Sequence, residues 1–141
     1  MDVVETISVM NMAAKTIFLG SLKVYNYEVI PNVMRDLEKE LKNCSCVLIG
    51  CGMGADEDTK AVTKFVIENS EVPIVIDADG INCLQGNVEW LDNAKAPVIL
   101  TPHPKEMSRI ANVSVEEILL NRGAVVGSFT KAHNSTLVLK G

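Results

Sequence analysis

The sequence contains few aromatic residues, no excess of positive charge and no targeting signal. Aromatic side chains make up 4% of the 141 residues and hydrophobic residues 48%, so the core must be built mainly from aliphatic side chains. Such a core favours repeated strand–helix units over an all-β sandwich. The net charge of −5 argues against nonspecific nucleic-acid binding, which needs a basic surface. Phosphate can still bind, because backbone N–H groups attract anions whatever the net charge.

The chain also lacks the segments that direct proteins to membranes. It has no hydrophobic run long enough to span a bilayer and no lipidation motif. It starts with Met1-Asp-Val-Val-Glu5, which is acidic where a signal peptide would be basic. We therefore expect a cytoplasmic protein without a membrane partner. The cysteines are spaced Cys-x-Cys at their closest, which fits small buried side chains in a reducing compartment better than a metal site.

The chain contains no low-complexity linker, internal repeat or charge block, which predicts one domain over residues 1–141. Alternating apolar patterns predict strands and helices in turn, and therefore an α/β fold with a mostly parallel sheet and helices on both faces. The predicted helices cover residues 3–19, 33–42, 59–69, 104–111 and 115–131. The predicted strands cover residues 22–30, 46–49, 72–76, 98–100 and 136–139.

A rigid elbow is predicted where the strand 98–100 meets the next helix. Its sequence is Thr101-Pro-His-Pro104, and the two prolines exclude both strand and helix between them. The elbow holds His103 and, just beyond it, Glu106 at the carboxyl end of a buried strand, where open α/β sheets bind ligands. A purely structural elbow would not need a histidine. The alternative is a surface imidazole on a tight turn.

The glycine-rich segment Ile49-Gly-Cys-Gly-Met-Gly54 follows another predicted strand and precedes a helix. Glycines at Gly52 and Gly54 let the backbone turn tightly and approach a ligand, and the helix start favours an anion. The segment with Ala55 also satisfies a loose dinucleotide pattern, with Asp77 near the spacing used for a ribose contact. A plain tight turn is the alternative interpretation.

Polar residues follow two further strands. Asp77 and Asp79 could orient a ribose or hold Mg²⁺ through water, and Asn82 could add a neutral hydrogen bond. Alternatively, Asp79 or Asn82 caps a short helix at residues 81–85. After the last strand, Lys140 and Gly141 could present an ammonium group and open backbone to phosphates, or the lysine could simply be solvated.

These four weak signals occur in one order, at the carboxyl ends of four successive predicted strands. Over residues 13–141 the chain resembles the ADP/ATP-dependent NAD(P)H-hydrate dehydratase family, of ribokinase-like fold, whose members have also been described as carbohydrate kinases. The most specific phrases are Asp-Ala-Asp and Thr-Pro-His-Pro-x-Glu. The matching segments are Ile49–Gly54, Pro73–Asn82, Leu100–Glu106 and Val138–Gly141.

The resemblance implies a lyase that repairs nicotinamide cofactors that have added water across a ring double bond. ADP or ATP phosphorylates the added hydroxyl group, and phosphate then leaves. Mg²⁺ is a further candidate cofactor. The positions implied to form the pocket of the hydrate are Gly52, Gly54, Asp77, Asp79, Asn82, His103 and Glu106. The positions implied to begin the phosphate site of the adenine nucleotide are Lys140 and Gly141.

The chain also departs from the family pattern. The family's Gly-x-Gly-Asp motif, which supplies the catalytic aspartate after the Lys-Gly strand, does not occur in these 141 residues. Segment 13–20 resembles the tail of the family's first helix, Ile7 and Ser8 stand near its expected Gly-Ala turn, and Cys51 and Met53 replace a proline and a leucine. We therefore expect an incomplete ribokinase-like domain that lacks its general base and has negligible turnover.

Three alternatives remain beside a hydrate dehydratase. One is a ribokinase-like kinase for a carbohydrate or a vitamin precursor, and another is a non-catalytic Rossmann-type dinucleotide-binding module. The elbow at His103 distinguishes the dehydratase from the Rossmann module, which has no need of it. The third is an inactive fragment whose hydrophobic strand 136–139 lies at a sheet edge, which predicts self-association. In each case we expect a homo-oligomer.

Overall fold

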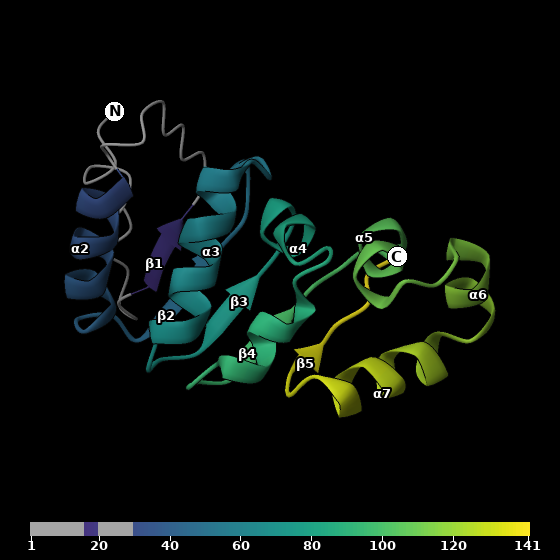
Figure 1. The fold of residues 1–141 in the computed structure, drawn as a ribbon. Coiled ribbons are helices and arrows are strands. Elements are labelled where there is room, and N and C mark those ends of the chain that lie inside the picture. Colours follow the sequence, from purple (N-terminus) through teal and green to yellow (C-terminus); the bar gives the residue numbers. More distant parts are fainter. Residues whose placement is uncertain (1–15, 20–29) are drawn as a thin grey trace.

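The computed structural model describes residues 16–19 and 30–141, which form a five-stranded, all-parallel sheet with helices (Figure 1). Its strands are β1 (Thr16–Leu19), β2 (Cys46–Ile49), β3 (Ile74–Ile76), β4 (Val98–Leu100) and β5 (Thr136–Leu137). Its helices are α2 (Ile30–Leu41), α3 (Glu57–Asn69), α4 (Asp79–Cys83), the 3₁₀ helix η1 (Val88–Asn93), α5 (Pro104–Ala111), α6 (Val115–Leu120) and α7 (Arg122–Ala132). The expected α/β class and parallel sheet are confirmed.

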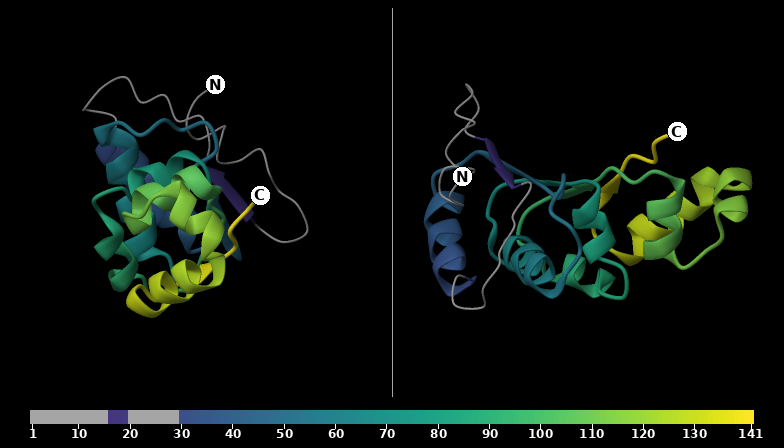
Figure 2. Two further views of the ribbon diagram at one scale, coloured as in Figure 1. Left: turned by 90° about the vertical axis from the view of Figure 1, so that its right-hand side faces the viewer. Right: turned by 90° about the horizontal axis from the view of Figure 1, so that it is seen from above.

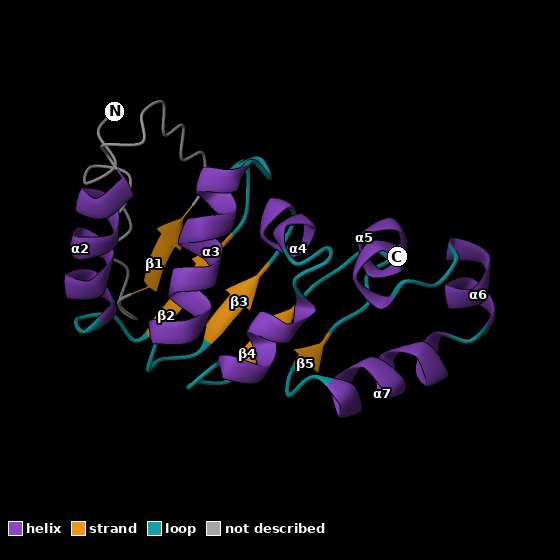
Figure 3. Ribbon diagram, in the orientation of Figure 1, coloured by secondary structure: helices purple, strands orange, loops and turns teal. Residues whose placement is uncertain are grey.

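The strands lie in the sheet in the order in which they occur along the chain. Connections between parallel strands are almost always right-handed, so an order that never reverses places every connecting helix on the same face. The described helices accordingly lie on one side of the strands, as the two views of Figure 2 show. Figure 3 distinguishes the helices and strands by colour. The prediction of helices on both faces therefore differs from what the described residues show.

The core lies between the sheet and these helices. Burial alternates along the strands: Val47 and Ile49 of β2 are buried, while their neighbours on the other face are partly exposed. Helix α3 covers these side chains with Val62 and Val66. Phe129 is the one aromatic residue among the buried hydrophobic side chains that the structure describes, so the core is aliphatic as predicted.

Several predicted elements differ from the structure. Residues 16–19 form β1, paired in parallel with β2, instead of the end of a helix. Hydrogen bonding to a neighbouring strand has therefore outweighed a helix-like apolar spacing. The rest of the helix predicted over 3–19, and residues 22–29 of the β-like segment, lie outside the described residues, and Ile30 begins α2.

The helix predicted over residues 115–131 is two helices, α6 and α7. The break lies at Asn121, whose φ of −132° and ψ of 42° are not helical. Ser114 caps the first helix as its spacing predicts, since its side chain accepts a hydrogen bond from the Glu117 N–H. The 3₁₀ helix η1 has no counterpart in the prediction. In the described part of the chain, every helix is too short or too polar to cross a bilayer.

Candidate functional site

The polar segments singled out in the sequence all follow the carboxyl ends of strands. Because all the strands are parallel, these ends lie together along one side of the sheet, which we call the carboxyl edge. Backbone hydrogen bonds join them to one another. The Asp77 N–H donates to the Ile49 carbonyl at 3.0 Å, and the Lys140 N–H donates to the Pro102 carbonyl at 2.8 Å. The ends of β2 to β5 thus form one continuous edge, as expected at the ligand-binding end of an open α/β sheet.

The first loop at this edge follows β2 and depends on Gly50. Its φ is +125°, and a Cβ atom built there would lie 1.8 Å from the Asp77 carbonyl oxygen. The end of β2 can therefore pass directly over the end of β3 only without a side chain. The predicted glycines Gly52 and Gly54 also have positive φ, of 71° and 75°.

The carboxylate of Asp79 joins the glycine loop to α4. Its Oδ2 accepts a hydrogen bond from the Gly54 N–H at 2.9 Å, and its Oδ1 accepts one from Asn82 Nδ2 at 3.3 Å. Neither side chain caps α4, whose N-cap is Ala78 without a side-chain hydrogen bond. The capping alternative for Asp79 and Asn82 is therefore wrong, and the short helix begins two residues earlier than residue 81.

Arg109, which sequence analysis did not single out, adds a further hydrogen bond to the network of Gly54, Asp79 and Asn82. Arg109 of α5 donates from Nη1 to Asn82 Oδ1 at 2.7 Å, so α5 is connected through α4 to the glycine loop. Arg109 is exposed, which leaves further guanidinium N–H groups directed away from Asn82. Its position on the helix after the elbow was the available signal, but an arginine in a last helical turn is common on surfaces.

Lys140 and Asp77 form an ion pair that joins the end of β5 to the end of β3. The lysine Nζ lies 2.7 Å from Asp77 Oδ1. Partial burial acts to raise the pKa of Asp77, but hydrogen bonds from Lys140 and Thr101 outweigh it and hold the pKa below its usual value. The hydrogen bond to Asp77 raises the pKa of Lys140. Lys140 is thus a fixed cation at this edge and is not simply solvated.

The elbow between β4 and α5 is built as predicted, but His103 has a structural role there. It is the N-cap of α5, and its Nδ1 accepts hydrogen bonds from the N–H groups of Lys105 and Glu106. The buried Glu106 carboxylate in turn accepts the His103 N–H at 2.9 Å. The expectation that a structural elbow would not need a histidine is therefore wrong, because the imidazole closes a capping box.

The end of β5 lies against the elbow. A Cβ atom built on Gly141 would lie 3.8 Å from Cδ of Pro104. Arg122, at the start of α7, donates hydrogen bonds to the carbonyls of Leu139 at 2.9 Å and Gly141 at 2.8 Å. Sequence analysis did not indicate Arg122, because these contacts join residues that are 17 and 19 positions apart.

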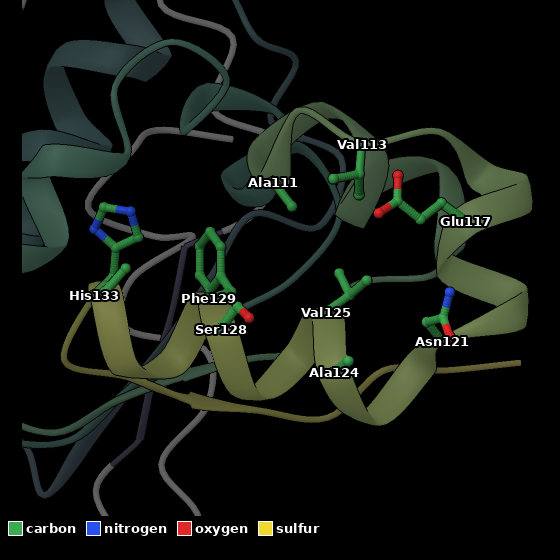
Figure 4. Close-up of a pocket in the computed structure, with 10 residues that line it drawn as sticks. Ala111, Val113, Glu117, Asn121, Ala124, Val125, Ser128, Phe129 and His133 are labelled. Carbon is green, nitrogen blue, oxygen red and sulfur yellow. The ribbon is translucent and has the colours of Figure 1, made fainter.

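A cavity of about 380 Å³ lies elsewhere, between α7 and the segment that joins α5 to α6 (Figure 4). Phe129 and Val125 point from α7 toward Ala111 and Val113 on its other side. None of the nine predicted site residues lines it. Its lining consists of Ala111, Val113, Glu117, Asn121, Ala124, Val125, Ser128, Phe129, Ala132 and His133.

The described residues do not form a metal site of their own. No group of three or more His, Cys, Asp or Glu side chains among residues 16–19 and 30–141 could hold a metal ion. The two aspartates suggested for Mg²⁺ are engaged within the protein, Asp77 with Lys140 and Asp79 with Gly54 and Asn82. Mg²⁺ at this edge would therefore depend on phosphate oxygens and water for most of its ligands.

The chain is similar to curated NAD(P)H-hydrate repair enzymes and dehydratases. The chain is 33% identical over 110 residues to a bifunctional NAD(P)H-hydrate repair enzyme of Thermofilum pendens, covering 78% of this chain and 21% of the relative. It is 28% identical to an ADP-dependent (S)-NAD(P)H-hydrate dehydratase of Neisseria meningitidis, covering 92% of this chain and 49% of the relative. The chain thus spans from about a fifth to a half of the length of the curated relatives it matches.

Solved structures show the same likeness. The ADP/ATP-dependent NAD(P)H-hydrate dehydratase of Bacillus subtilis, co-crystallised with ATP and Mg²⁺, has a TM-score of 0.61 and 26% identity, covering 81% of this chain and 46% of that protein. A ribokinase-like superfamily protein of Enterococcus faecalis shares the fold, with a TM-score of 0.64 and 22% identity over 89% of this chain and 46% of that protein. The family model for NAD(P)H-hydrate dehydratase matches residues 2–141. The chain therefore belongs to the NAD(P)H-hydrate dehydratase family.

Proposed function

We propose that the edge formed by the ends of β2 to β5 binds a hydrated NAD(P)H beside ADP or ATP, and that the chain serves ADP- or ATP-dependent (S)-NAD(P)H-hydrate dehydration. The observation that carries the proposal is the ion pair of Lys140 with Asp77, 2.7 Å long. This ion pair places Lys140, which is expected to bind nucleotide phosphates, next to Asp77, which is expected to border the hydrate. A phosphoryl donor and its acceptor must lie side by side for transfer.

The proposed roles follow from the contacts. The positive-φ backbone at Gly52 and Gly54 allows close approach of the dinucleotide, with Asp79 and Asn82 fixing the loop. Lys140 donates one ammonium hydrogen to Asp77, which leaves two for phosphate oxygens. Gly141 continues this phosphate site with backbone that has no side chain in the way. Glu106 and His103 border the hydrate from the elbow.

The three carboxylates predicted at this site, Asp77, Asp79 and Glu106, are not free to act as a general base. Glu106 is buried, accepts a hydrogen bond from the His103 backbone N–H and lies 3.3 Å from the His103 ring. Asp77 is paired with Lys140, and Asp79 accepts hydrogen bonds from Gly54 and Asn82. Each of these groups is engaged in holding the edge together. The residues at this edge therefore bind and orient the substrates, and deprotonation of the hydroxyl group requires a base from outside this set, as the family's Gly-x-Gly-Asp motif implies.

This division of roles predicts binding without turnover. The 141-residue chain is expected to bind hydrated NADH more tightly than intact NADH, and to convert it to NADH with ATP no faster than buffer does. Titration calorimetry and the absorbance of the dihydronicotinamide ring measure the two properties.

Clear ATP-dependent conversion would contradict the assignment of these residues to binding alone. Equal affinity of the folded chain for hydrated and intact NADH would contradict the proposed function and favour a kinase or a general dinucleotide-binding module.

We also expect self-association, for which the exposed Leu119 and Leu120 of α6 provide an apolar surface.

A further inference from the structure

Arg109 begins a series of three hydrogen bonds that joins α5 to the glycine loop through α4. Its Nη1 donates to Asn82 Oδ1 at 2.7 Å. Asn82 Nδ2 donates to Asp79 Oδ1 at 3.3 Å, and Asp79 Oδ2 accepts the Gly54 N–H at 2.9 Å. We call these four residues the Arg109 network. Its first and last bonds join residues 27 and 25 positions apart, so the network connects separate segments of the chain.

The network fixes the orientation of the Asn82 amide. A guanidinium group has only donors, and an ionised carboxylate has only acceptors. The amide oxygen must therefore face Arg109, and the amide NH₂ group must face Asp79. In the reverse orientation both hydrogen bonds would be lost, because donors would face donors and acceptors would face acceptors. Arg109 thus determines how Asn82 meets Asp79, and its charge strengthens the bond by which it does so.

The start of α4, where Asp79 lies, has a strained backbone. Ala78 precedes Asp79 with a φ of 48°, which is rare for a residue with a side chain, and it is an N-cap without a side-chain hydrogen bond. Such a conformation persists only where the surrounding contacts hold it. The bonds of Asp79 to Gly54 and Asn82 are two contacts of this kind, and the second depends on Arg109.

Gly54 lies at the far end of the network. It is exposed, and a Cβ atom built on it would meet nothing within 4 Å, so its N–H bond to Asp79 ties an otherwise open part of the loop to α4. We propose that Arg109 is a positioning residue for the glycine loop, acting through the Asn82 amide and the Asp79 carboxylate. The consequence for hydrate binding rests on the proposed function, whereas the network does not.

Hydrogen exchange tests the network without a ligand. In Arg109→Met the amide hydrogen of Gly54 is expected to exchange with water about fivefold faster, as nuclear magnetic resonance of the ¹⁵N-labelled chain would measure. The matched control is Lys131→Met, because Lys131 is likewise the basic residue in the last turn of its helix. It should leave the Gly54 rate nearly unchanged. If Arg109→Met does not fold, Arg109→Lys, which keeps the charge without the planar group, should raise the rate about twofold. An unchanged rate in the Arg109 variant, or an equal rise in the control, would overturn the network.

A substitution of Asn82 tests whether Arg109 acts through the amide. Asn82→Ala alone should raise the Gly54 exchange rate about fivefold, and adding Arg109→Met should raise it little further, because the two residues share one path to the loop. A further fivefold rise in the double variant would mean that Arg109 reaches the loop by another path, such as the stability of α5. That result would overturn the positioning role.

The affinity for hydrated NADH, measured by calorimetry, is expected to follow the exchange rates. Arg109→Met and Asn82→Ala should each weaken binding about fivefold, and together no more than either alone. If Arg109→Met weakens binding equally in the Asn82→Ala background, Arg109 contacts the ligand directly and is not a positioning residue.

Two further outcomes separate this inference from the proposed function. If the exchange rate of Gly54 rises in Arg109→Met while the affinity is unchanged, the position of Gly54 does not matter for the hydrate, and the inference about binding is wrong. If the exchange rates show the expected coupling but the original folded chain does not bind hydrated NADH, the proposed function fails and the network remains.

Discussion

Replacing Gly50 by alanine is expected to lower the free energy of unfolding by at least about 3 kcal/mol, the largest effect of any small substitution at the candidate site. The new Cβ atom would lie 1.8 Å from the Asp77 carbonyl oxygen, which is backbone and cannot turn aside as a side chain would. The φ of +125° adds strain for any residue with a side chain. The ends of β2 and β3 must therefore separate.

Urea unfolding followed by circular dichroism measures this change. The matched control is Gly86→Ala, since Gly86 also has a positive φ, of 75°, but has open space around its Cβ position. That substitution should cost only about 1–2 kcal/mol, from the backbone conformation alone. Similar losses for the two variants would show that β2 and β3 do not approach as closely at Gly50 as the structure indicates.

The second large effect is expected on nucleotide binding. Lys140→Met should weaken the affinity for ADP and ATP about tenfold or more, because it removes the ammonium group that Asp77 holds at the end of β5. Asp77→Asn should weaken it less, since the lysine keeps its charge but loses the partner that fixes it. The effect should be greatest at low ionic strength, because salt screens the attraction between the lysine and phosphate.

Lys131→Met provides the control for charge. It lowers the net charge by the same amount on an exposed turn of α7, so it should leave nucleotide affinity within about twofold of the original if local contacts decide binding. Isothermal titration with ADP and ATP compares the three variants. An equal loss in Lys140→Met and Lys131→Met would mean that overall charge is responsible and that Lys140 is not part of the nucleotide site.

Much of the fold could be predicted because local signals agreed with tertiary structure. The strands at Cys46–Ile49 and Val98–Leu100 and the helix at Pro104–Ala111 have the predicted boundaries, since β-branched runs and prolines mark their ends. The placing of the site at the carboxyl edge followed from parallel strands alone. Which faces of the sheet the helices cover could not be predicted in this way. It depends on the order of the strands in the sheet, and no local pattern in this sequence specifies that order.

Contacts between side chains that lie far apart in the sequence could not be predicted from the sequence. Lys140 and Asp77 are 63 residues apart, and Arg109 and Asn82 are 27 apart. Each of these residues alone is an ordinary polar residue near the end of an element. The capping role of His103 was missed for a different reason. Histidine is an uncommon helix cap, and its side chain was interpreted as a ligand group or as a surface imidazole on a tight turn. β1 was mistaken for helix because a four-residue apolar segment fits either structure.

The central claim is that the loops after β2, β3, β4 and β5 form one binding edge for hydrated NAD(P)H and an adenine nucleotide. Backbone amide shifts of the ¹⁵N-labelled chain during titration with hydrated NADH and then ADP test it most directly. We predict that Gly54, Asp79 and His103 shift with the first ligand, and Lys140 and Gly141 with the second. Shifts confined to the cavity beside Val113 and Phe129, with the strand ends unchanged, would contradict the account.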